Sequence, residues 1–113
     1  MTIAELRRRD VLRLVERRTT DATAAEIETE TKEARHTMSL FYRFAAAYQR
    51  SFYTEQDRNA TQAEKDRADE KSEKAYKRAA ESLKKYDLRI SCPGLYPIID
   101  ETSGANFTQG FYY

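Results

Sequence analysis

The sequence predicts an all-α fold, in which a shorter N-terminal helix lies across a long antiparallel helical hairpin. Three segments open with the pattern Ser/Thr-x-x-Glu, which is typical of helix starts. Apolar residues in the middle of the chain recur at spacings of three and four, the period of a helix face. Only 3 Gly and 2 Pro among 113 residues leave too few turns for a many-stranded sheet. We expect a single domain over residues 1–113, because the chain is too short for two separate cores.

The first helix is expected at about residues 3–18. It opens on Thr2-Ile-Ala-Glu5, in which the threonine hydroxyl can accept a hydrogen bond from a first-turn backbone N–H group. Its apolar residues gather on one side and its arginines lie mostly elsewhere. The apolar side should cover part of the helix that follows.

The second helix, expected at about residues 24–53, opens on Thr23-Ala-Ala-Glu26 and has the clearest pattern. A heptad-like seam runs along it, and a seam of this kind faces a partner helix. The seam residues are Ile27, Thr31, Ala34, Met38, Phe41, Ala45, Tyr48 and Phe52. In the second half of the helix Tyr42, Phe44 and Tyr53 widen the apolar arc beyond what one partner helix can cover.

The third helix, expected at about residues 62–88, opens on Thr61-Gln-Ala-Glu64 and has a narrower seam of mostly small residues. Its outer face carries acid-before-base pairs four residues apart, which support helicity and solubility rather than a binding site. The polar stretch 54–60 should let the two long helices fold back on each other. Matching large residues to small ones then places Phe41 near Ala75.

The last stretch, residues 91–113, changes character. Its prolines and glycines prevent a long helix, yet it is too apolar for a disordered tail. We therefore expect an irregular, aromatic segment that packs on the helices.

Composition bounds the classes of function. With 20 basic and 19 acidic residues the net charge is only +1, so the chain as a whole is neither a strong polycation nor a polyanion. Cys92 is the only cysteine, which excludes an intrachain disulfide and favours a reducing, cytoplasmic location. The apolar runs are far too short for a membrane span, so no membrane association is expected.

No catalytic, metal or cofactor site is expected. His36 and Cys92 are the only residues of their types, and structural zinc needs about four such ligands. Nothing around Cys92 resembles an activating motif, and the glycines at 94, 104 and 110 do not form a phosphate-binding loop. An enzyme is therefore the least favoured class.

Aromatic residues suggest an interaction protein. The chain holds 8 Tyr and 5 Phe, and tyrosine is favoured at interfaces because it combines an apolar face with a polar tip. The candidates for a protein-binding surface are Tyr42, Tyr53, Phe111, Tyr112 and Tyr113. The leading prediction is a small non-enzymatic accessory protein, a type that sometimes comes from phages or other mobile elements. Its partner would be another protein or a second copy, with a homodimer completing a four-helix core.

Arginines in the first helix support an alternative function, nucleic-acid binding by a small regulator. Guanidinium groups pair bidentately with phosphates, and the candidates are Arg7, Arg8, Arg13 and Arg17. A competing interpretation pairs residues 1–18, with charge +3, with residues 19–34, with charge −4, within one chain or between two.

Overall fold

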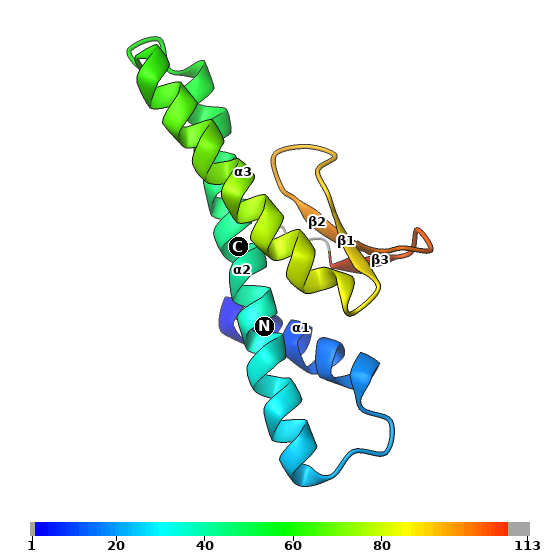
Figure 1. Cartoon of the computed structure of the whole chain (residues 1–113). Helices are drawn as coiled ribbons and strands as arrows, with labels where there is room; N and C mark the ends of the chain where they lie inside the picture. The colour runs from blue at the N-terminus through cyan, green and yellow to red at the C-terminus, as the bar shows by residue number, and fades with distance from the viewer. Residues whose placement is uncertain (1, 109–113) are drawn as a thin grey trace.

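The computed structural model describes residues 2–108, and it confirms a mostly α-helical fold with three helices. Its elements are α1 (Ile3–Arg18), α2 (Ala24–Gln56), α3 (Gln62–Lys84), β1 (Leu88–Ser91), β2 (Ile98–Glu101) and β3 (Asn106–Thr108). Helices α2 and α3 lie side by side along the long axis, α1 crosses α2, and the strands lie beside the C-terminal half of α3 (Figure 1). The three predicted aromatic residues 111–113 lie outside the described residues.

Each helix begins where the sequence predicts. The hydroxyl groups of Thr2 and Thr23 accept from the backbone N–H groups of the residues three positions on, both at 3.2 Å. The hydroxyl of Thr61 accepts in the same way at 3.1 Å. Each bond satisfies one of the N–H groups that a helix start leaves without an intrahelical partner. The three starts are therefore encoded locally.

The end of α3 differs from the prediction, because the helix stops at Lys84 instead of residue 88. Its last turn tightens into i→i+3 bonds from Tyr86 and Asp87, and Asp87 has a φ of 58°. Aspartate tolerates this left-handed conformation better than most residues, and it turns the chain out of the helix. Leu88 and Ile90 are then buried while Arg89 is exposed, which is the alternation of a strand.

The segment expected to be irregular contains a three-stranded antiparallel sheet in the order β1-β2-β3. Ile90 pairs with Ile99 across the first two strands, and a register irregularity follows Ile99 on the side of β3. The buried side chains of the sheet join the same core as the helices, so the expectation that this segment packs on them is confirmed for the described residues.

The core lies where α1, the middle of the hairpin and the sheet meet. The central seam residues of α2 are fully buried, with Ala34, Phe41 and Ala45 at 0% exposure. Ile27 and Phe52, at the two ends of the seam, are both 42% exposed. The seam prediction therefore holds for the centre of α2 only.

The register of the hairpin is offset from the predicted one by about one helical turn. The Thr37 and Ser82 hydroxyl oxygens lie 2.6 Å apart, and the ring centroids of Phe44 and Tyr76 lie 5.3 Å apart. These pairs place Phe41 level with residues 78–79, where Ala79 is fully buried, instead of with Ala75. The expected matching of a large residue with a small one occurs, but with a different alanine.

Candidate functional site

Arg13 and Arg17, two of the four arginines predicted to contact phosphates, instead bind the C-terminal segment that forms the sheet. Arg13 Nη1 donates to the Phe107 carbonyl oxygen, and its guanidinium carbon lies 4.2 Å from the Phe107 ring centroid. Arg17 Nε donates to the Tyr86 carbonyl oxygen at 3.0 Å, and Arg17 Nη1 lies 2.8 Å from Glu101 Oε1. Both side chains therefore hold α1 against the sheet through hydrogen bonds within the chain.

Charge complementarity between α1 and the acidic opening of α2 takes the form of one ion pair in the described part of the chain. Arg18 Nε lies 3.7 Å from Glu30 Oε2. Glu33, in the same acidic stretch, lies 3.8 Å from Lys85 after the end of α3. The acidic first turns of α2 thus form ion pairs both with α1 and with the residue that follows α3. Most arginines of α1 make no ion pair with these acids.

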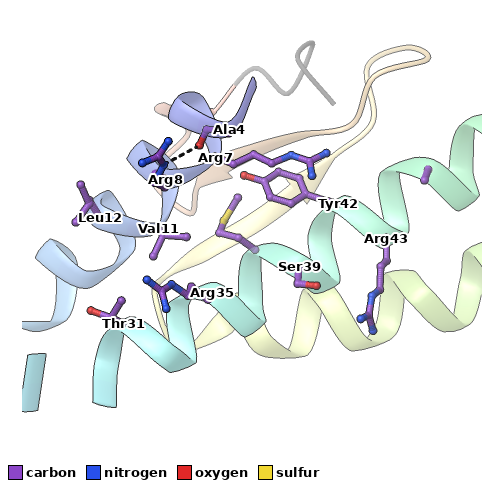
Figure 2. A pocket seen from close by; sticks show the side chains of 12 residues that line it. Ala4, Arg7, Arg8, Val11, Leu12, Thr31, Arg35, Ser39, Tyr42 and Arg43 are labelled. Carbon is purple, nitrogen blue, oxygen red and sulfur yellow. Dashed lines mark hydrogen bonds between the residues drawn. The ribbon is translucent and has the colours of Figure 1, made fainter. Parts of the chain in front are cut away.

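Tyr42 is half-buried and held in place on three sides. Its hydroxyl donates to Asp10 Oδ2 at 2.9 Å, and Asp10 is only 4% exposed. The Arg7 guanidinium carbon lies 4.3 Å from the Tyr42 ring centroid, and the Phe41 ring meets it edge-on. Figure 2 shows Arg7 and Tyr42 side by side. The Tyr42 side chain is therefore fixed in place by its neighbours and does not project freely into solvent.

Tyr53, the other predicted aromatic on α2, lies near the far end of the hairpin and is 59% exposed. Its ring centroid is 5.7 Å from that of Phe52, in an edge-to-face arrangement. The structure therefore separates Tyr53 from Tyr42: Tyr53 is near the turn that joins α2 to α3, and Tyr42 is beside α1.

A groove runs between α1 and α2, with a volume of about 740 Å³ (Figure 2). We call it the α1–α2 groove. Its lining residues are Ala4, Arg7, Arg8, Val11, Leu12, Thr31, Arg35, Met38, Ser39, Tyr42, Arg43 and Ala46. Four of them are arginines and none is acidic, while the rest of the lining is largely apolar. The groove therefore combines an apolar floor with a cationic rim.

A second groove of about 730 Å³ runs between α2 and α3, and we call it the α2–α3 groove. Its lining residues are Leu40, Arg43, Ala46, Ala47, Arg50, Arg67, Glu70, Lys71, Lys74, Ala75 and Arg78. Six of these are cationic. Glu70 is the single acid, and its Oε1 atom lies 3.0 Å from Lys74 Nζ.

The two grooves share Arg43 and Ala46 and so form one continuous surface, which we call the cationic face. It holds nine cations and one carboxylate, which amounts to +8. Because the chain carries +1 in total, its remainder carries −7. A near-neutral protein has therefore separated its charges into a positive face and a negative remainder.

Most of these cations lack a carboxylate partner. Within residues 2–108, eight of the nine cations of the cationic face make no ion pair: Arg7, Arg8, Arg35, Arg43, Arg50, Arg67, Lys71 and Arg78. Surface cations of this kind are solvated and mutually repulsive, which costs stability at low ionic strength. A polyanion that neutralised them would remove this cost.

Sequence reasoning missed the α3 contribution because it assigned the charges of that helix to intrahelical pairs. Of the acid-before-base pairs expected four residues apart on this helix, Glu70–Lys74 forms an ion pair, whereas Glu81, expected to pair with Lys85, pairs with Lys84. Cations at positions 67, 71, 74 and 78 recur at helical spacing, and this was the available signal. This spacing alone did not reveal the groove, because only the hairpin register shows that arginines of α2 line the same groove.

Other chemistry receives little support from the described residues. No cluster of three or more His, Cys, Asp or Glu side chains among residues 2–108 could hold a metal ion. Cys92 is exposed, and desolvation of the thiol raises its pKa, which disfavours a reactive thiolate. Burial likewise raises the pKa of Tyr86. None of α1, α2 and α3 has an apolar stretch of the length that crossing a bilayer requires.

Comparison of the chain with models of protein families, with curated proteins and with solved structures finds no match.

Proposed function

We propose that this chain is a small non-enzymatic binding protein whose ligand is a nucleic acid, held through its phosphates by the cationic face. One observation carries the proposal: nine cations and one carboxylate line two joined grooves on a chain whose net charge is only +1. Phosphate contacts from lysine and arginine supply most of the affinity of sequence-independent nucleic-acid binding.

The kind of cation favours phosphate over a carboxylate-rich protein surface. Seven of the nine cations are arginines, whose planar guanidinium groups match the oxygens of a phosphate bidentately. Five of these arginines are spread along α2 and α3, so that they can contact successive phosphates of an extended chain. A folded acidic protein would have to present an equally regular row of carboxylates.

The proposal changes the residues expected to bind. Arg7 and Arg8 of the first helix remain in the set, whereas Arg13 and Arg17 leave it because they hold the sheet. Seven of the nine cations come from α2 and α3. The ligand class is therefore the one that the N-terminal arginines suggested, a nucleic acid, but most of the binding surface lies on α2 and α3.

The first experiment is a salt titration of binding to a fluorescein-labelled oligonucleotide, followed by fluorescence anisotropy. We expect log K to fall linearly with log salt, with a slope of about −0.7 to −0.9 for each phosphate neutralised. A total slope steeper than about −3 would show that several cations of the face act together. No binding at about 50 mM salt, or binding indifferent to salt, would contradict the proposal.

A protein partner or a second copy of the chain is the second candidate, and the exposed pair Phe52–Tyr53 favours it. Two neighbouring exposed aromatic side chains are typical of protein contacts. Such a contact buries apolar surface and is therefore expected to tolerate salt. In the anisotropy titration it would appear as an absence of oligonucleotide binding.

A further inference from the structure

We infer that the ligand is single-stranded: its phosphates follow the α2–α3 groove, and an unpaired base enters the α1–α2 groove. This inference rests on the proposed function, because it specifies the form of nucleic acid that the cationic face accepts.

The two grooves differ in chemistry, and the difference matches the two parts of a nucleotide. The α2–α3 groove has one large apolar side chain, Leu40; its other apolar residues are alanines, and it carries six cations. The α1–α2 groove has several larger apolar side chains, Val11, Leu12 and Met38, and four cations. A sugar–phosphate backbone carries the charge and a base carries the flat, weakly polar surface. The backbone therefore suits the first groove and the base suits the second.

The α2–α3 groove has cations on both of its walls. On α3 the cations from Arg67 to Arg78 are eleven residue steps apart, or about 16 Å at 1.5 Å per residue. On α2, Arg43 and Arg50 form the opposite wall. The hairpin register, given by Phe44 beside Tyr76, brings Arg43 level with Arg78 and Arg50 level with Lys71.

Cations on two facing walls suit one strand better than two. Packed helices have axes about 8–10 Å apart, so the depression between them admits a single extended chain and excludes a duplex. A duplex could contact only the upper edges of the two walls. A single strand in the groove can contact both rows at once and neutralise more of the cations.

The α1–α2 groove offers a surface that a duplex cannot use. Bases in a duplex are stacked on each other, so their faces are covered and cannot contact an apolar floor. The groove volume of about 740 Å³ lies within the range of sites for small organic ligands. Asp10 and Arg7 already hold Tyr42 in place, so the Tyr42 side chain loses little conformational entropy when a ligand binds.

The test compares three labelled ligands of equal length: a single strand, the corresponding duplex, and a strand with several abasic sites. All three retain the phosphates, but only the single strand presents unpaired bases throughout. We expect the single strand to bind about tenfold or more tightly than the other two, from the loss of stacking. Duplex binding that equals or exceeds single-strand binding would overturn the inference and leave the proposed function standing. No binding of any ligand would overturn both.

A neutral variant locates the base. Leu12 lines the α1–α2 groove and is 56% exposed, so Leu12→Gln should fold normally and leave the charge unchanged. We expect it to weaken single-strand binding about threefold to tenfold without changing the salt slope. Ile3→Gln is the matched control, since Ile3 is 54% exposed on the same helix and outside the groove. Equal behaviour of the two variants would overturn the placement of the base.

Discussion

Replacing Arg43 and Arg50 with glutamate together is expected to weaken nucleic-acid binding by more than about 100-fold at moderate salt. Arg43 lines both grooves, and Arg50 lies two helical turns further along the same wall of the α2–α3 groove. Neither side chain makes an ion pair with a carboxylate within the described residues, so their replacement breaks no ion pair of the fold. The two new carboxylates would also repel the phosphates.

The salt slope makes this result specific. Each lost phosphate contact should make the slope about one unit less steep, so the double variant should lose about two units. The matched control is Arg58→Glu with Arg89→Glu, which changes the net charge equally at exposed positions outside both grooves. If the two double variants lost affinity equally, binding would depend on overall charge, and the cationic face would not be the site.

Phe107→Ala is expected to lower the free energy of unfolding by about 3–5 kcal/mol, as truncation of a buried phenylalanine does. Phe107 is 4% exposed in β3 and belongs to the core that the sheet shares with the helices. Its ring also supports the Arg13 guanidinium, whose carbon lies 4.2 Å from the ring centroid. That contact adds about 0.5–2 kcal/mol to what the variant loses.

Urea denaturation followed by circular dichroism measures this loss. Total stabilities of domains are about 5–15 kcal/mol, so a substantial unfolded fraction of the variant is expected at modest urea. Tyr96→Ala is the control, because Tyr96 is 47% exposed in the turn region of the same sheet and should cost less than about 0.5 kcal/mol. A loss below about 1 kcal/mol for Phe107→Ala would show that the sheet is not anchored through this ring.

The Phe107 result also bears on Arg13. If Arg13 is a part of the fold, removing it and removing Phe107 should be non-additive, because the two groups contact each other directly. A phosphate-binding role would instead leave their effects on stability independent. The coupling therefore separates the structural role of Arg13 from the binding role that the sequence suggested.

Some of the fold is readable from short stretches of sequence. Thr2, Thr23 and Thr61 cap their helices through hydroxyls that reach only three residues along the chain. The central seam of α2 is equally visible, because a helix places residues three and four apart on one face whatever lies opposite. Both features depend on interactions inside one helix.

The end of α3 shows where local reading fails. Tyr86 and Ile90 are four residues apart and extend the seam of α3, so a helical period and a strand period both fit this stretch. The choice is made by the pairing of Leu88–Ser91 with Ile98–Glu101, which lies ten or so positions along the chain. Strands of four residues carry too little pattern to reveal such a pairing.

The sequence by itself determined three helices, their starting residues and the apolar face that joins the two long ones. Only the tertiary structure decided the hairpin register, the sheet, the inward turn of Arg13 and Arg17, and the cationic face. The physical reason is range: caps and helical periodicity act over a few residues, whereas the cationic face needs Arg7, Arg43 and Arg78 from three helices to meet. Charges that nearly cancel over the whole chain gather on one face only when packing sets which helices adjoin.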